Sequence, residues 1–411
     1  MTGWTPSRAL GACAAAGLLI AGLVTGCAAQ ADSAPRAEHS ERGRLVRAES
    51  VHTYSPIDVA KELGDTGFDA AAVRYGVETY RLVYDTVDSR GQATTASGLL
   101  AVPISGDRDL TGVVFEHGTM FAKADAPSVA EHSGDLAATL AFASAGFAGI
   151  TPDYLGLGAG PGAHPYLDLP SETTASLDMV RAAGIQAESI NRPLRPELEI
   201  SGFSQGGPAA LALARALQND SVSAFRPAAV AAISGPYAVR AAELPALLDN
   251  RINPVSGTLY ISYTLVAWNR LHPIYRSPEE LFRAPYAAGI ESLFDGSHSD
   301  VEIAQTLPPL DALLTPKAFD LLRDPSGPFA DALRTADASC RDWTPRFPIR
   351  LYTASADTDV AQDNSAQCRT DLGRNGVDAP ITDLGPLDHP SSGKAGVAVA
   401  LRWFLESHPA H

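Results

Sequence analysis

The feature that most constrains the fold is a short strand-like run that leads directly into a serine between two glycines. Residues 198–201 alternate apolar and polar side chains, and residues 202–206 read Gly-Phe-Ser-Gln-Gly. An alanine- and leucine-rich segment follows, typical of a helix. On such a sharp strand-to-helix turn, Gly202 and Gly206 leave out side chains that would collide, and the Ser204 hydroxyl is exposed. The pattern predicts a serine nucleophile; a glycine-rich turn whose serine only caps the helix is the alternative.

A serine hydroxyl is a weak nucleophile, so it requires a base and an acid that orients the base. The apolar run at residues 349–353 leads to Asp357, which would stand just past the carboxyl end of a strand. Asp359 is the rival, and the spacing from Asp357 to Val360 favours Asp357. The run of acids there lacks the ligand and glycine positions of an EF-hand, so we expect no calcium loop.

His389 is the expected base, because histidine can take and return a proton near neutral pH. It follows a short strand-like run at residues 381–384 and precedes a final amphipathic helix, which gives the chain order serine, aspartate, histidine. His117 and His164 are the competing candidates for the base. The alternative role for these two is that of a buried, hydrogen-bonded histidine.

The oxyanion hole is expected from two backbone N–H groups. A hydrophobic run at residues 113–115 ends in Glu-His-Gly-Thr at residues 116–119. In hydrolases with this kind of turn, such a loop supplies one donor and the residue after the nucleophile supplies the other. We therefore expect Thr119 and Gln205 to donate, although Gly118 in its His-Gly dipeptide could equally mark a simple turn.

The remaining pattern predicts an α/β fold, with a mostly parallel central sheet flanked by helices. A hairpin at residues 78–86 and 96–104 opens the sheet. Further strands are expected at residues 112–115, 147–151, 198–201, 228–233 and 348–353, and helices at 134–145, 171–187 and 206–219. We predict a core at residues 51–235 and 347–411, and a helical cap insertion at 236–346 over the site end of the sheet. An independent helical domain is the alternative for the insertion.

The amino terminus reads as a targeting signal. Arg8 precedes an uncharged apolar run at residues 9–24, which is short for a transmembrane helix. The small residues before Cys27 match the bacterial lipobox, which implies removal of residues 1–26 and a lipid anchor on Cys27 that holds the protein on the membrane. An ordinary secretory signal or an uncleaved anchor are the alternatives, and all three place the protein outside the cytoplasm. Residues 27–50 carry few large apolar side chains, which predicts a flexible tether.

Of the four cysteines, Cys13 lies in the predicted signal sequence and Cys27 is the predicted lipidation site. Cys340 and Cys368 remain as a pair. In an oxidising compartment we expect a disulfide, worth about 3 to 4 kcal/mol in the chain-entropy model; two buried free thiols are the alternative. No third cysteine or nearby histidine completes a zinc site, so we expect no metal.

The formal net charge of −16 argues against a nucleic-acid partner, because no cluster of lysine and arginine could follow a phosphate backbone. Such acidity also disfavours a substrate with several negative charges, which leaves a neutral small molecule or lipid ester as the expected substrate.

Four blocks together resemble the secretory lipase family, the α/β-hydrolases similar to Candida antarctica lipase A. They are Phe-Glu-His-Gly-Thr at 115–119, Thr-Pro-Asp-Tyr-Leu-Gly-Leu-Gly at 151–158, His-Pro-Tyr-Leu at 164–167 and Gly-Phe-Ser-Gln-Gly-Gly at 202–207. The resemblance spans residues 75 to 405. It implies a cap with an acyl pocket and hydrolysis of carboxylic esters by Ser204, Asp357 and His389 without a cofactor. The cap carries no signature of the family, so acyl-chain preference is not predicted.

Three other functions are compatible with parts of this pattern. Acyl transfer to an alcohol or sugar in the cell envelope would use the same three residues. A peptidase is disfavoured because the chain has no propeller-like repeats and no acidic anchor for a peptide amino terminus. An inactive binding protein would ordinarily have lost one of the three residues, and each has a candidate here.

Overall fold

A computed structural model describes Met1 and residues 42–407. The predicted signal sequence, Cys27 and the predicted tether up to residue 41 lie outside the described residues. Within the described part of the chain, no helix combines the length and apolar character needed to cross a membrane.

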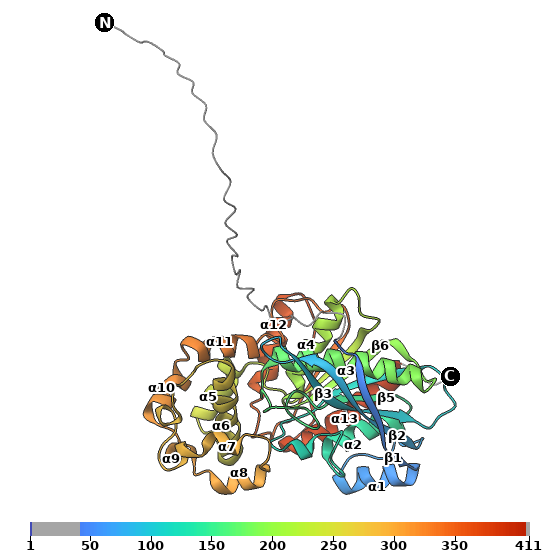
Figure 1. Cartoon of the computed structure of the whole chain (residues 1–411), viewed down its shortest axis with the longest axis horizontal. Helices are drawn as coiled ribbons and strands as arrows, with labels where there is room; N and C mark the ends of the chain where they lie inside the picture. The colour runs from blue at the N-terminus through green and yellow to red at the C-terminus, as the bar shows by residue number, and fades with distance from the viewer. Residues whose placement is uncertain (2–41, 408–411) are drawn as a thin grey trace, which may run out of the picture. The chain divides into compact units, whose positions relative to one another are not determined.

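The described strands form one sheet, of which Figure 1 labels β1, β2, β3, β5 and β6. Its strand order is β1-β2-β3-β5-β4-β6-β7-β8-β9. The strands from β5 to β9 in this order run parallel to one another, while β1, β2 and β3 join the sheet antiparallel. The mostly parallel sheet expected from the sequence is therefore confirmed. The bounds are β1 Leu45–Tyr54, β2 Val77–Val87, β3 Ala93–Pro103, β4 Leu110–Glu116, β5 Ala148–Pro152, β6 Leu194–Phe203, β7 Arg226–Ile233, β8 Ile349–Thr353 and β9 Ile381–Asp383.

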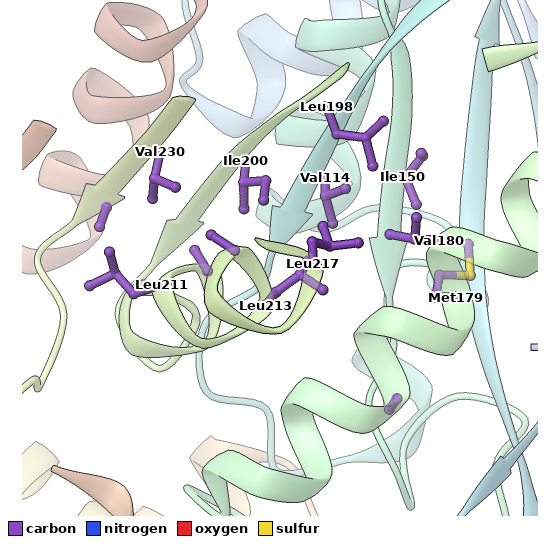
Figure 2. Close-up of a cluster of buried hydrophobic side chains, with 14 of the residues drawn as sticks. Val114, Ile150, Met179, Val180, Leu198, Ile200, Leu211, Leu213, Leu217 and Val230 are labelled. Atoms are coloured by element: carbon purple, nitrogen blue, oxygen red, sulfur yellow. The ribbon is translucent and has the colours of Figure 1, made fainter. Parts of the chain in front are cut away.

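Helices cover both faces of this sheet. One apolar cluster joins the strands to α3 (Leu169–Ser189), α4 (Gly206–Asn219) and α12 (Asp363–Arg374). Figure 2 shows Leu211 and Leu213 of α4 turned toward Val114, Ile200 and Val230 of three neighbouring strands. The opposite face packs against α1 (Pro56–Thr66), α2 (Gly134–Ser144) and α13 (His389–Ser407). This arrangement confirms the expected α/β class, with helices on both faces of a mostly parallel sheet.

The sheet begins earlier than the sequence predicted. Residues 27–50 were expected to form a tether, yet β1 starts at Leu45 and pairs along β2 in an antiparallel ladder. Most side chains of β1 are exposed, so this strand is held by backbone hydrogen bonds rather than by burial of apolar surface. A prediction based on apolar content could not detect such a strand.

Between β7 and β8 the described chain forms helices, in the segment predicted as a cap. They are η2 (Val239–Glu243), α5 (Leu244–Leu248), α6 (Pro254–Leu271), η3 (Pro278–Glu280), η4 (Tyr286–Ala288), α7 (Ile290–Leu293), α8 (Asp300–Thr306), α9 (Leu310–Leu313), α10 (Pro316–Arg323) and α11 (Gly327–Ala336). These helices share an apolar cluster that also takes in Phe121 and Tyr166 from outside the insertion. The indole N–H of Trp268 on α6 donates to the carbonyl oxygen of Tyr166 at 2.9 Å. The insertion therefore packs on the segments that follow β4 and β5.

The predicted disulfide is present. Cys340, after α11, is bonded to Cys368 in α12, with their Cα atoms 5.3 Å apart. It joins the segment that leaves the insertion to a helix of the core. A disulfide of this kind is typical of proteins that fold in an oxidising compartment.

Candidate active site

Ser204 lies on the sharp turn between β6 and α4, with a backbone φ of 55° that non-glycine residues rarely adopt. The Ser204 N–H donates to the carbonyl oxygen of Ile233 at 2.9 Å, which fixes the turn to β7. A Cβ atom at Gly202 would lie 2.0 Å from the carbonyl oxygen of Gly206, and one at Gly206 would lie 1.9 Å from that of Glu116. Both predicted glycines therefore stand where a side chain would collide with backbone.

The structure brings Ser204, His389 and Asp357 together. The Ser204 hydroxyl lies 2.8 Å from Nε2 of His389, and Nδ1 of His389 lies 2.7 Å from Oδ2 of Asp357. A carboxylate only accepts hydrogen bonds, so Nδ1 carries the proton and Nε2 is left to accept from the hydroxyl. Ser204 and Asp357 follow β6 and β8, and His389 begins α13 after β9. The carboxyl ends of these three strands share one edge of the parallel sheet.

Asp357 is held by its own loop, because Oδ1 accepts the backbone N–H groups of Asp359 and Val360 at 2.9 and 3.0 Å. The rival acid Asp359 instead approaches the hydroxyl of Tyr260 on α6 at 3.4 Å. Asp357 is thus the carboxylate on the imidazole, whereas Asp359 faces the cap.

The two competing histidines lie elsewhere. Nδ1 of His117 is 2.7 Å from the carbonyl oxygen of Gly118, and Nε2 of His164 is 3.0 Å from the side-chain nitrogen of Gln205. Both rings are buried. In the part of the chain that the structure describes, each occupies the buried, hydrogen-bonded role that was the alternative for it.

Thr119 and Gln205, the expected oxyanion donors, lie beside Ser204 and line a cavity with it. Gln205 precedes the first residue of α4, so its backbone N–H lies at a helix amino terminus, where partial positive charge favours an anion. The Thr119 loop is held by two further contacts. The Thr119 hydroxyl lies 3.0 Å from the Tyr166 hydroxyl, and the Gly118 N–H lies 3.4 Å from Oδ1 of half-buried Asp135.

Two cavities meet at Ser204. The first is lined mostly by apolar residues of the insertion, among them Leu244, Leu247, Ile252, Ile261 and Phe329. The second is lined by His389, Lys394 and Asp135 together with Phe68 and Phe203. Thr119, Ser204, Tyr260 and Asp359 line both cavities. The Ser204 hydroxyl therefore stands between an apolar space under the cap and a more polar space beside the imidazole.

Buried acids around the site escaped the sequence analysis. Burial raises the pKa of Glu116 to about 7, that of Glu172 to about 8 and that of Glu243 to about 7. Glu172 lies within a predicted helix, one turn before buried Ala175 and Ser176. Its place on the apolar face of that helix was therefore readable from the spacing. Among the described residues, no group of three or more His, Cys, Asp or Glu side chains could hold a metal ion.

Solved structures of similar shape decide the fold. No family model matches the chain, and no curated protein matches it. A candidate hydrolase from Legionella pneumophila superposes with a TM-score of 0.81 at 25% identity, over 89% of this chain and 99% of that one. This protein has a lipase-like α/β-hydrolase fold.

Two more hydrolases with this fold are similar to the chain. The rice cell wall degrading esterase LipA from Xanthomonas oryzae superposes with a TM-score of 0.76 at 27% identity, over 89% of this chain and 99% of LipA. Candida antarctica lipase A in its closed state has a TM-score of 0.62 at 16% identity, over 89% of this chain and 82% of the lipase, and shows the fold alone. The Legionella hydrolase and LipA support a hydrolase.

Proposed function

We propose that this chain is a serine hydrolase that cleaves neutral carboxylic esters through a Ser204–His389–Asp357 triad and an acyl-enzyme. The observation that carries the proposal is the pair of contacts at 2.8 and 2.7 Å that links the Ser204 hydroxyl through His389 to Asp357. The strained turn that carries Ser204 and the esterase among the similar structures support the same reaction.

In the first step, Ser204 Oγ attacks the ester carbonyl carbon while its proton passes to Nε2 of His389. Negative charge develops on the carbonyl oxygen, where the backbone N–H groups of Gln205 and Thr119 are proposed to donate. The carbon–oxygen bond of the alcohol then breaks, and Nε2 returns the proton to the departing oxygen. Asp357 keeps the imidazole oriented and stabilises its cationic form.

In the second step, water attacks the acyl-enzyme while giving its proton to His389 Nε2, and Ser204 leaves as the hydroxyl again. His389 takes up a proton and gives one back in each step, first to the alcohol and then to Ser204, so the cycle requires no other acid or base.

The two cavities suggest where each half of the ester binds. The leaving oxygen must lie within hydrogen-bond reach of Nε2 of His389, which lines the second cavity. We assign the alcohol half to that cavity and the acyl half to the apolar cavity under the cap, which Gln205 also lines. No lysine or arginine is among the residues that line the acyl cavity, and Glu243 and Asp359 are, so we assign neutral acyl groups.

The test is hydrolysis of p-nitrophenyl esters from acetate to palmitate by the chain without its first 26 residues, beside Ser204→Ala at each length. We expect Ser204→Ala to lower the rate by about 10⁴-fold or more, because the residual activity of such variants comes from binding and the oxyanion hole alone. Equal rates for the two proteins would reject the nucleophile. A fluorophosphonate probe should label the wild type and leave Ser204→Ala unlabelled.

Product analysis in the same assay tests hydrolysis against acyl transfer. With an added alcohol, a hydrolase releases mainly free acid, whereas a transferase would convert most of the acyl group to the new ester. We propose hydrolysis because the more polar cavity, which His389 and Lys394 line, is partly open to solvent.

We also propose an extracytoplasmic location with a lipid anchor on Cys27. The lipobox at the end of the apolar leader and the Cys340–Cys368 disulfide support it. Replacement of Cys27 by serine should move the protein from the membrane fraction to the soluble fraction of its native host, and unchanged membrane retention would contradict the anchor.

A further inference from the structure

The side chain of Gln205 is attached to two buried groups that the proposed mechanism leaves unused. Its side-chain nitrogen lies 2.7 Å from Oε1 of Glu172 and 3.0 Å from Nε2 of His164. All three side chains are at most 2% exposed. Burial of these three polar side chains next to the nucleophile costs desolvation free energy, which their mutual hydrogen bonds must offset.

The orientation of each partner follows from the atoms around it. Nδ1 of His164 lies 2.8 Å from the carbonyl oxygen of Leu155, which can only accept, so Nδ1 carries the proton. Burial lowers the pKa of His164 to about 3, which keeps the ring neutral and leaves Nε2 as an acceptor. The amide of Gln205 therefore donates one hydrogen to His164 and the other to Glu172.

The three residues come from different parts of the fold. Glu172 lies in the first turn of α3, His164 lies in the loop before that helix, and Gln205 lies between β6 and α4. The two hydrogen bonds consequently fix the start of α4 to the start of α3. The backbone of the adjacent Ser204 is strained, with a φ of 55°. Hydrogen bonds to the neighbouring Gln205 side chain therefore help to keep this turn in its strained conformation.

We propose that Glu172 and His164 are positioning residues, which hold the Gln205 side chain so that its backbone N–H is aimed at the carbonyl oxygen of the bound ester. This inference rests on the proposed function, in which that N–H is an oxyanion donor. Such a donor acts through its direction, because the hydrogen bond must strengthen as charge develops on the oxygen. Restraining the residue in advance removes a reorganisation that the reaction would otherwise require.

The chemistry of Glu172 supplies a conservative variant. With a pKa of about 8, this carboxyl carries its proton through most of the neutral range, so a glutamine has the same shape and the same charge. Glu172→Gln keeps an oxygen that can accept from Gln205, whereas Glu172→Leu removes it. Gln205→Met keeps the backbone N–H and the side-chain length while removing both donors.

The experiment compares these variants in kcat and KM for one p-nitrophenyl ester and in inhibition by a trifluoromethyl ketone. This ketone forms a tetrahedral adduct with a serine, and in the adduct the former carbonyl oxygen is the oxyanion. Gln205→Met and Glu172→Leu should lower kcat by about 10-fold or more, since loss of a whole oxyanion donor costs about 10²- to 10³-fold. Their KM should stay within about threefold of the wild type, and their inhibition constants should rise in step with the fall in kcat.

The matched control is Tyr84→Phe. It removes a buried hydrogen bond of similar length onto the same helix, from the Tyr84 hydroxyl to the carbonyl oxygen of Ala175 at 2.9 Å. This variant should lose stability without a change in kcat or in the inhibition constant. Glu172→Gln should restore both values to near wild type.

Unchanged kcat and unchanged inhibition in folded Gln205→Met would overturn the inference, as would a Glu172→Gln that is as slow as Glu172→Leu. Either result, obtained with an active wild type, would leave the proposed function intact. A wild type whose ester hydrolysis does not depend on Ser204 would instead reject the proposed function.

Discussion

The peptide units around Ser204 are packed so closely that single atoms decide whether the turn can form. A Cβ on Gly206 would lie 1.9 Å from the carbonyl oxygen of Glu116 and 2.8 Å from that of His117. Both obstacles are backbone atoms of the strand and loop beside the site, so no rotation of a side chain can relieve them. At the residue scale, the position of the nucleophile therefore depends on the absence of one methyl group.

We predict that Gly206→Ala lowers the free energy of unfolding by about 3 kcal/mol, the upper part of the range for overpacked sites, and abolishes labelling by a fluorophosphonate. Gly373→Ala is the matched control, because this glycine lies in α12 with no atom within 4 Å of its added Cβ. Alanine there should stabilise the protein by about 0.5 to 1 kcal/mol. Urea denaturation measures both, and equal effects from the two variants would contradict the argument.

At the scale of elements, the two ends of the insertion are joined by one buried carboxylate. Asp337, just after α11, accepts the backbone N–H groups of Val239 and Arg240 at 2.6 and 3.3 Å, at the start of η2. Those N–H groups lie at a helix beginning, where no carbonyl oxygen of the helix itself can satisfy them. The first and last helical segments of the insertion are thereby held together beside the acyl cavity, which Val239 lines.

We predict that Asp337→Ala destabilises the protein by about 2 to 4 kcal/mol, because it leaves two N–H groups without their acceptor. Asp337→Asn should cost less, since one oxygen can still accept from Val239. Exposed Asp331, within α11, gives a control whose replacement by alanine should change stability by less than about 0.5 kcal/mol. Chemical denaturation measures the free energy of unfolding of each variant. Similar decreases for Asp331→Ala and Asp337→Ala would contradict the prediction.

Over the whole molecule, the buried carboxyl groups link stability to pH. Burial raises the pKa of Glu116, Glu172 and Glu243 from the usual value of 4.5 to about 7, 8 and 7. A carboxyl with a raised pKa holds its proton more tightly in the folded chain than in the unfolded chain. Its stabilising contribution is therefore complete below pH 4.5 and is lost as the pH rises toward the folded value.

We predict that the free energy of unfolding falls between pH 5 and about pH 8, and that it falls less steeply in Glu172→Gln. The glutamine cannot ionise, so the difference between the two proteins isolates one group from the remaining charges. Urea denaturation across this range measures both slopes. Parallel pH profiles for the wild type and Glu172→Gln would show that Glu172 does not titrate as its burial requires.

Much of the fold could be predicted from the sequence, because strands and helices of the core carry local signals. The hairpin, the parallel strands and α2, α3 and α4 lie within a few residues of their expected bounds. Ser204, Asp357 and His389 were also identified as candidates, since each follows a strand-like run, and in a parallel sheet the carboxyl ends of strands meet at one edge. Strand β1 was missed because its stability lies in pairing with β2, which the composition of a single segment does not show.

What the sequence by itself determined was therefore which residues are chemically able to act and in which order they occur. Only the tertiary structure shows that Asp357, and not Asp359 two residues further on, contacts the imidazole of His389. Only the tertiary structure likewise placed Glu172 and His164 against Gln205 and set two cavities on either side of Ser204. Such contacts join segments that are distant along the chain, and their geometry depends on packing that no local pattern encodes.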